Sequence, residues 1–235
     1  MTPRLLLAGP YRAGTVELSD AHAHYLKRVL RLKPGAEVVV YDGMGTSWHA
    51  VTHADDRSLG LELLRPRATV AAPAQRIWLA LAVIKAMDSA LRKAVELGAT
   101  DLLPFESAYT NRPANRDHGK ERRHWSQILE SAAAQCEQDH LPALHERSTY
   151  EAIISGPPTS QTLLLDPRGE PWPQPLPQAS TTLIIGPEGG FSDEELELAR
   201  NTNVPIVRMG SLILRAETAP LAALVRLQTG WELTR

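Results

Sequence analysis

The sequence predicts an α/β protein with a small β-rich domain over residues 1–70 and a larger domain over residues 74–235. Short β-prone runs dominate the first seventy residues, whereas apolar strand-like runs and helical runs alternate from Ile77 onward. Such alternation is typical of βαβ units and a mainly parallel sheet. Between the two patterns, Pro66 to Ala74 is rich in prolines and small residues without regular periodicity, which predicts the domain boundary.

In the first domain, we expect strands where β-prone residues cluster, at 5–8, 37–41, 48–52 and 59–64. The Asp-Gly-Met-Gly turn at 42–45 joins the middle two strands as a hairpin. A helix is expected over 20–30, because Ser19 is a good N-cap and Pro34-Gly35 ends the helical pattern.

In the larger domain, strands are expected at 77–83, 101–105, 162–165, 182–185 and 205–207, and helices at 87–97, 122–138, after 192 and at 219–233. Gly98 closes the first of these helices, and Ser192 with Glu195 forms a capping box. Pro220 suits the first turn of the last helix. A proline-rich loop is expected over 167–177.

The composition excludes several classes of protein. A net charge of −2 argues against a general polyanion binder, so any nucleic-acid contact must be local. The single cysteine, Cys136, excludes a disulfide framework, fits a reducing cytosol and is expected inside a buried helix. His22 and His24 would point about 200° apart on a helix, so we expect no metal site. No apolar run is long enough for a membrane span, and we expect a cytoplasmic protein without a membrane partner.

Two loops predict a ligand pocket. Residues 186–192 read Gly-Pro-Glu-Gly-Gly-Phe-Ser and residues 209–218 read Met-Gly-Ser-Leu-Ile-Leu-Arg-Ala-Glu-Thr, and each follows a strand and precedes a helix. Ligands bind outside the carboxyl ends of parallel strands, and glycines let the backbone approach them. A plain tight turn is an equal alternative for the first loop. A phosphate site is disfavoured, because the Lys-Ser/Thr ending of a P-loop is absent and Glu188 would repel phosphate.

The second loop carries Arg215 and Glu217, whose side chains would share one side of an extended backbone. They could present a charged site to a polar substrate, or form the surface ion pair that is the more common arrangement. The apolar residues 212–214 could line a cleft for a flat ring or belong to the core.

Together, the two loops resemble the RsmE family of 16S ribosomal RNA uracil-N3 methyltransferases, in the SPOUT superfamily. Three other segments support the resemblance: His24 to Arg31 is similar to the family's N-terminal helix, Lys93 to Gly98 to its first methyltransferase helix, and Glu130 to Cys136 to its Ala-Ala-Glu-Gln-Cys segment. The family continues that segment with Gly-Arg, whereas this chain reads Ala-Ala-Gln-Cys-Glu-Gln over 133–138. A second departure lies at Lys85 to Asp88.

The resemblance implies a PUA-like RNA-binding β-barrel followed by a SPOUT domain with a trefoil knot, acting as a homodimer. It implies methylation of N3 of a specific uridine in 16S ribosomal RNA within a small-subunit particle. A SPOUT methyltransferase acting on another RNA or base position is the alternative. The cofactor would be S-adenosyl-L-methionine, bound by Leu165, Ile185, Gly186, Pro187, Glu188, Gly190, Met209, Gly210, Ser211, Leu212, Leu214 and Ala216.

Under the same resemblance, Arg215 would stabilise negative charge on the uracil carbonyls, and Glu217 would accept the N3 proton or orient Arg215. Clustered basic residues would contact RNA, and we assign this role to His24, Lys27, Arg28, Arg31 and Arg112. A nucleotide hydrolase and a non-catalytic RNA-binding module are the competing interpretations. The first lacks an evident phosphate-facing lysine with acidic metal ligands, and the second would not need two ligand-shaped loops.

Overall fold

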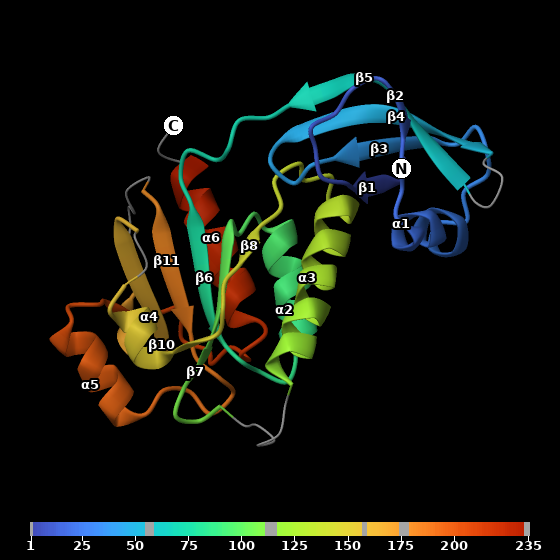
Figure 1. The fold of residues 1–235 in the computed structure, drawn as a ribbon. Helices are drawn as coiled ribbons and strands as arrows, with labels where there is room; N and C mark the ends of the chain where they lie inside the picture. The colour runs from blue at the N-terminus through green and yellow to red at the C-terminus, as the bar shows by residue number, and fades with distance from the viewer. Residues whose placement is uncertain (1, 55–58, 111–116, 157–158, 174–178, 233–235) are drawn as a thin grey trace. The chain divides into compact units, whose positions relative to one another are not determined.

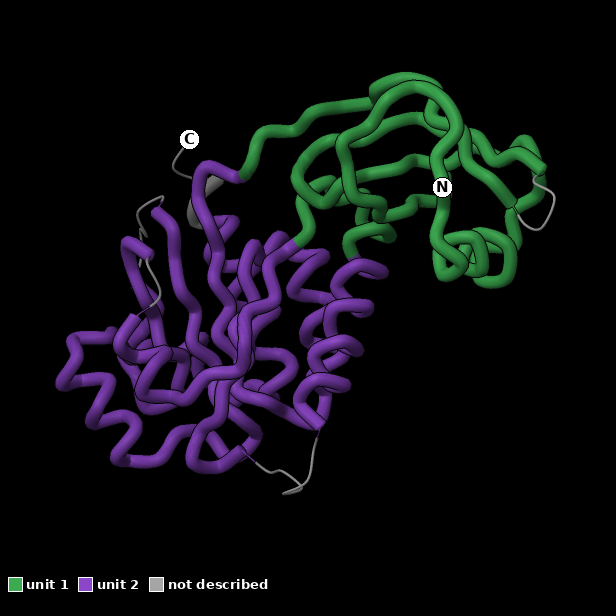
Figure 2. The backbone as a smooth tube through the Cα atoms, in the orientation of Figure 1, with its two compact units in different colours: residues 1–72, 133–141 green, residues 73–132, 142–235 purple. Residues whose placement is uncertain are grey.

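The computed structural model describes residues 2–54, 59–110, 117–156, 159–173 and 179–232, and the chain divides into two compact units (Figures 1 and 2). The first unit contains residues 1–72 together with 133–141, and the second contains 73–132 and 142–235. The chain therefore returns to the first unit after it has begun the second. Nothing in the periodicity of residues 133–141 predicts this return.

The first unit is a five-stranded sheet in the order β1-β3-β4-β5-β2. Its elements are β1 (Arg4–Leu6), β2 (Gly14–Val16), α1 (Asp20–His24), the π-helix η1 (Tyr25–Val29), β3 (Glu37–Tyr41), β4 (Thr46–Ala54) and β5 (Leu59–Thr69). The predicted β3–β4 hairpin is confirmed, since Asp42 accepts backbone hydrogen bonds from Met44 and Thr46 across the turn. Leu26, Val38, Val40 and Leu61 are buried in its core.

Two predictions for this unit are wrong in part. Strand β5 continues to Thr69 through the segment predicted to lack regular structure. Pro66 is tolerated there because the β4–β5 register shifts beside its partner Trp48, and proline is accommodated at such bulges. The single helix predicted over 20–30 begins at the predicted N-cap but changes to a π-helix, in which Leu30 N donates to Tyr25 O. Strand β2 was not predicted.

The second unit is an α/β domain with a parallel sheet in the order β12-β10-β11-β6-β7-β8, and β9 also pairs with β7. Its elements are β6 (Ile77–Ala82), α2 (Met87–Glu96), β7 (Asp101–Glu106), α3 (His118–Gln135), β8 (Ala143–Leu144), β9 (Ser148–Thr149), α4 (Tyr150–Ile154), β10 (Gln161–Pro171), β11 (Thr181–Ile185), α5 (Asp193–Asn201), β12 (Ile206–Arg208) and α6 (Ala219–Glu232). The predicted parallel α/β class is confirmed.

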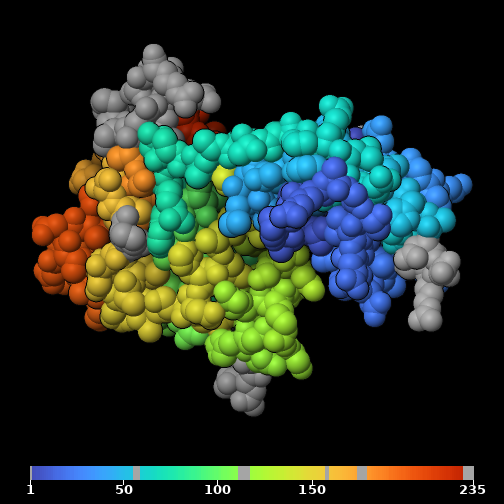
Figure 3. Space-filling model, turned by 45° about the horizontal axis from the view of Figure 1, so that its top comes forward, coloured from blue at the N-terminus to red at the C-terminus, as the bar shows by residue number. Residues whose placement is uncertain are grey.

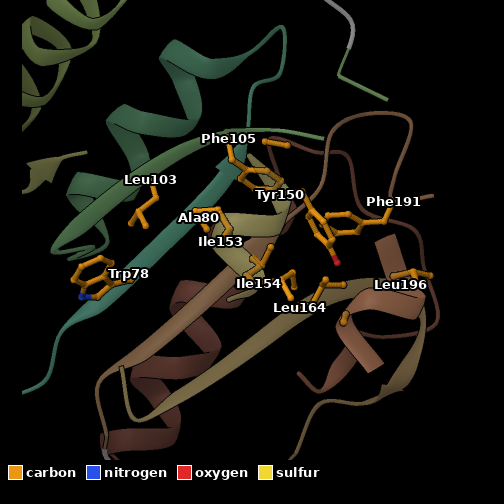
Figure 4. Packing of buried hydrophobic residues seen from close by; sticks show 13 residues of the cluster. Trp78, Ala80, Leu103, Phe105, Tyr150, Ile153, Ile154, Leu164, Phe191 and Leu196 are labelled. Atoms are coloured by element: carbon orange, nitrogen blue, oxygen red, sulfur yellow. The ribbon is translucent and has the colours of Figure 1, made fainter. Parts of the chain in front are cut away.

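The central strands are buried on both faces, as their continuous apolar runs predict. Helices α4 and α5 cover one face, and α2 and α6 pack together on the other (Figure 1). Figure 4 shows the first of these interfaces, where the rings of Tyr150 and Phe191 lie 5.5 Å apart. The Tyr150 hydroxyl donates to Glu195 O at 2.6 Å. Burial, reinforced by the Glu195 carboxylate, raises the pKa of Tyr150, so the hydroxyl keeps its proton as a donor.

Several boundaries differ from the prediction. Strand β10 extends to Pro171 into the predicted proline-rich loop, because residues 170–171 pair with β12. Helix α3 begins four residues earlier than predicted and ends at Gln135, so Cys136 is half-buried just beyond the helix rather than inside it. Helix α4 and the two short strands β8 and β9 were not predicted. Gly98 with a positive φ, the Ser192–Glu195 capping box and Pro220 in α6 are confirmed.

Glu195 offers a test of the second unit's stability. Its buried carboxylate accepts from Ser192 N at 2.8 Å, from Ala108 N at 2.9 Å and from Ser107 Oγ at 3.1 Å. Replacing Glu195 by Ala leaves these donors without their acceptor, and we expect a loss of about 2–3 kcal/mol in the free energy of unfolding, measured by denaturant titration. The exposed Glu197→Ala is the matched control and should cost at most about 0.5 kcal/mol. Equal effects of the two changes would contradict this account.

Candidate active site

Four parallel strands end at one edge of the sheet, and the loops that follow them line a cavity of about 600 Å³. The loops follow β6, the first part of β10, β11 and β12. Leu165 of β10 pairs with both Ile185 of β11 and Val207 of β12. These three residues therefore lie at the same level of the sheet edge. The cavity therefore forms where parallel strands direct their loops toward a ligand.

The loop after β11 is shaped by Phe191. A Cβ atom on Gly186 would lie 2.9 Å from the buried Phe191 ring, so glycine at this position is what lets the ring pack under the loop. Gly190 has φ of 73° and donates its N–H to Pro187 O at 2.9 Å. A positive φ favours glycine, and the turn is thereby fixed. Ile185 at the end of β11 and the loop residues 186–188 line the cavity.

Glu188 connects two of the loops. Its Oε1 accepts the backbone N–H of Lys85 at 2.8 Å, which ties the loop after β11 to the loop after β6. Lys85 and Ala86 line the cavity as well. Neither residue was assigned from sequence, although their place shortly after a buried strand is the signal that could have identified them.

Asp166 forms a further wall, held by an arginine two residues later. The Asp166 carboxylate is buried and accepts from Arg168 N at 2.9 Å, from Nε at 2.8 Å and from Nη2 at 3.0 Å. Arg168 Nη2 also donates to Phe191 O at 2.7 Å, so this segment of β10 is joined to the loop after β11. The hydrogen bonds to Asp166 are the main cause that raises the pKa of Arg168. Asp166 was not assigned from sequence, although it directly follows Leu165.

The loop after β12 carries the most exposed side chains of the site. Leu212 and Ile213 are 80% and 81% exposed at the edge of the cavity. Arg215 Nη1 lies 3.9 Å from Glu217 Oε1, with 86% of the arginine side chain and 33% of the glutamate side chain exposed. Arg215 O accepts from Ala219 N at 2.9 Å, so this loop turns directly into α6. The pair is loosely coupled and free to meet a substrate.

The structure brings almost all predicted site residues together. The cavity is lined by Leu165, Ile185, Gly186, Pro187, Glu188, Gly190, Met209, Gly210, Leu212, Leu214, Arg215, Ala216 and Glu217. Ser211 is exposed and does not line it. Beyond the predicted set, the lining includes Lys85, Ala86, Asp166, Pro167, Phe191, Val207, Arg208, Ile213 and Ala219.

The predicted RNA contacts lie in the first unit, with one exception. His24 ends α1, Lys27 and Arg28 lie on η1, and Arg31 follows with φ of 54°, and all four are exposed. Arg112 lies outside the described residues. Within the described ranges, no cluster of three or more His, Cys, Asp or Glu side chains is arranged to hold a metal ion. None of the described helices is both long enough and apolar enough to cross a membrane.

Comparison with known proteins defines the class. Residues 71–228 match the model of the RNA methyltransferase domain, and residues 18–61 match the RNA methyltransferase PUA domain. The protein is therefore an RNA methyltransferase, an enzyme, with an N-terminal PUA-like domain. A Synechocystis protein named ribosomal RNA small subunit methyltransferase E is 32% identical over 225 residues, covering 91% of this chain and 72% of its own. The chain belongs to the ribosomal RNA small subunit methyltransferase E family.

Solved structures agree with this assignment. A putative methyltransferase from Legionella pneumophila, in complex with bound cofactor SAM, has a TM-score of 0.90 at 26% identity and covers 97% of this chain and 98% of its own. A ribosomal RNA small subunit methyltransferase E from Neisseria gonorrhoeae, bound to S-adenosyl methionine, has a TM-score of 0.88 at 28% identity and covers 98% of both chains. These relatives displace the hydrolase and the non-catalytic module as interpretations.

The bond between Glu188 and Lys85 N predicts how the loops support ligand binding. Glu188→Ala removes the acceptor, and we expect binding of S-adenosyl methionine to weaken about 2- to 10-fold, the worth of one hydrogen bond, measured by calorimetry. Glu188→Gln keeps an amide oxygen for the same bond and should bind nearly as the wild type does. Equal weakening in both variants would show that the carboxylate charge, not the bond, matters.

Proposed function

We propose that this enzyme transfers a methyl group from S-adenosyl-L-methionine to N3 of a specific uridine in 16S ribosomal RNA, within a small-subunit particle in the cytoplasm. The observation that carries the proposal is the single cavity at the sheet edge. It is lined by the two loops whose sequences resemble those of uracil-N3 methyltransferases, with Arg215 and Glu217 on its lining. The binding of S-adenosyl methionine by two similar structures supports the choice of cofactor.

The cavity suits this cofactor on chemical grounds. Leu165, Ile185 and Leu214 offer apolar surface for the adenine ring, and the glycine-rich loop at 186–190 leaves backbone groups open for hydrogen bonds. The buried Asp166 carboxylate, which Arg168 holds in place, adds hydrogen-bond acceptors to the wall of the same cavity. The bound cofactor would supply an electrophilic methyl group on its sulfonium. In this proposal, the cofactor is therefore held by Leu165 of β10 and by residues of the loops after β11 and β12.

The mechanism assigns separate roles to Arg215 and Glu217. N3 of uracil carries a proton at neutral pH, and the nitrogen is a poor nucleophile until that proton leaves. Glu217 accepts the N3 proton, and the charge that remains is shared with the ring carbonyl oxygens. Arg215 donates to one of these oxygens and stabilises the charge while N3 forms its bond to the methyl carbon and the methyl–sulfur bond breaks. The loose Arg215–Glu217 pair supports this, because neither side chain is locked to the other.

The finer features of the fold are part of the proposal: a PUA-like domain over 1–70, a SPOUT domain over 74–235 and a trefoil knot. Support for the knot comes from β12, since Val207 pairs with both Leu165 and Glu170 and thus lies between two parts of β10. A Cβ atom on Gly169 would lie 2.5 Å from Ile206 O, so the chain over 166–170 passes closely around β12. We further propose a homodimer, supported by the exposed apolar side chains of Leu212, Ile213 and Val225.

Nucleoside analysis tests the proposed reaction. Mass spectrometry of 16S ribosomal RNA from a strain that lacks this gene should show loss of one N3-methyluridine, restored when the gene is returned. Purified enzyme with S-adenosyl-L-methionine should restore the same nucleoside on small subunits from the deletion strain. Loss of a different methylated nucleoside, or loss from another RNA, would support the alternative SPOUT activity instead.

Arg215 and Glu217 can be tested separately from cofactor binding. Arg215→Ala and Glu217→Ala should each lower kcat by about 100-fold or more, because charge stabilisation and proton transfer act in the transition state. The thermal shift produced by S-adenosyl-L-methionine should persist in both variants. Arg200→Ala, which removes an exposed arginine paired with Glu197 on α5, is the matched control and should keep full turnover. Near-wild-type turnover in the first two variants would remove both residues from the chemistry.

A further inference from the structure

A second cavity, of about 200 Å³, lies in the first unit and belongs to none of the sites described above. Its buried floor is formed by β1, β3 and β4, whereas the parts from β5 and from the 133–141 segment are exposed. Strand β5, cyan to turquoise in Figure 3, lies at the surface of this unit. The lining residues are Thr2, Arg4, Glu37, Val38, Val39, His49, Ala50, Leu64, Arg65, Arg67 and Glu137.

Arg4 is the unusual member of the floor. It is only 5% exposed, its guanidinium stacks over the Tyr41 ring at 4.6 Å, and one nitrogen pairs with Asp139. Its Nε and Nη1 have no hydrogen-bond partner among the described residues. Buried guanidinium donors are normally satisfied, so this pair of unpartnered donors beneath the cavity is unusual, although the surrounding residues shield both nitrogens from solvent.

The charges around the cavity decide what kind of acceptor fits. Arg67 lies 3.6 Å from Glu137 and 3.7 Å from Asp139, and Glu37 adds a further carboxylate to the rim. Arg4, Arg65 and Arg67 are thus balanced by three carboxylates, Asp139 included. A phosphate would gain little from a nearly neutral site and would meet repulsion from the carboxylates. A neutral ring that carries both acceptors and donors on its edges suits the site better.

Among nucleobases, guanine has this pattern. Its O6 and N7 are the acceptors that arginine recognises, and its N1–H and N2–H groups are donors for a carboxylate. The exposed side chain of Leu64 at the rim offers an apolar surface to the face of the ring. The volume of this second cavity is one third of that of the cofactor cavity. It suits a single base, whereas S-adenosyl-L-methionine, a nucleoside joined to an amino acid, needs the larger one.

Glu137 adds an independent observation. It has φ of 60°, in the left-handed region, directly after the half-turn that ends α3. Glycine is the usual residue in that conformation because a side chain is strained there. This conformation closes α3, since Gln138 N donates to Ala133 O at 2.9 Å. Here the strained residue places a carboxylate on the rim of the cavity that contains the unpartnered arginine.

We propose that this cavity binds an unpaired guanine of the RNA substrate. Arg65 donates to the acceptor edge of the base, Glu37 and Glu137 accept from its N–H groups, and the buried Arg4 adds positive charge beneath the ring. The proposal rests on the proposed function insofar as the ligand is RNA. It places base-specific recognition on the sheet of the PUA-like unit, whereas the exposed basic residues of α1 and η1 contact RNA without reading a base.

The experiment uses the full-length enzyme and oligouridylate strands that carry one central guanosine, inosine or adenosine, with pure oligouridylate as the reference. Dissociation constants are measured by fluorescence anisotropy. The wild type should prefer guanosine over adenosine by about 5- to 100-fold, the discrimination of one good bidentate contact, and inosine, which lacks N2–H, should fall between them. Arg65→Ala should abolish the preference and leave oligouridylate affinity within about 2-fold.

Glu137→Gly keeps the experiment interpretable, because it relieves the left-handed strain and should raise Tm while abolishing the guanosine preference. Arg12→Ala, an exposed arginine of the same unit outside the cavity, is the matched control and should keep the preference. Reversing Arg28 and Arg31 to Glu should weaken all four strands equally.

Two outcomes would overturn the inference. In the first, Arg65→Ala weakens binding of all strands equally and lowers the slope of log K against log salt concentration by about one, as the loss of one phosphate contact does. In that case the cavity binds the RNA backbone and not a base. If the wild type shows no guanosine preference, the cavity reads no base. Methyl transfer to small subunits is measured in parallel. Failure of that reaction would overturn the proposed function, whereas intact transfer without a guanosine preference would overturn this inference alone.

Discussion

The site depends on the common direction of β6, β10, β11 and β12. Because these strands are parallel and adjacent, the loops after them meet at one edge, although nearly 130 residues separate Lys85 from Leu214 in the chain. Their apolar sequences bury both faces of the sheet and fix the register at which Leu165, Ile185 and Val207 align. Given that alignment, small local features suffice to shape the cavity.

Hydrogen bonds between loops then hold the edge in place. Arg168 binds Asp166 within β10 and Phe191 O in the loop after β11, and Glu188 binds Lys85 N in the loop after β6. In addition, the Glu195 carboxylate ties the loop after β7 to the start of α5. Apart from the Arg168–Asp166 pair, each bond joins segments that are distant in sequence, so the binding edge is stiffened by contacts that no local pattern encodes. The loop after β12 is held from α6, where Arg226 Nη1 donates to Met209 O at 2.9 Å, and that loop carries the proposed catalytic pair.

Features that depend on local sequence could be predicted. The alternation of apolar runs predicted the parallel α/β class, and the residues assigned to the cofactor through the family resemblance, all but Ser211, line one cavity. The features that could not be predicted from the sequence depend on contacts between distant segments. Strand β5 persists through Pro66 because it bulges where it pairs with β4. Asp166 and Lys85 enter the site because the sheet brings their segments to the same edge. The return of 133–141 to the first unit likewise rests on Asp139 meeting Arg4, a pair separated by 135 positions.

That return has a consequence for how such a protein can be divided or recombined. A fragment ending at residue 72 would hold every strand of the first sheet, yet it would lack the carboxylate that neutralises its most buried arginine. The unit is continuous in space but not in the gene. Exchange of the N-terminal unit between relatives would therefore have to carry the 133–141 segment with it, so the two parts of this enzyme are expected to have been inherited together rather than shuffled as modules.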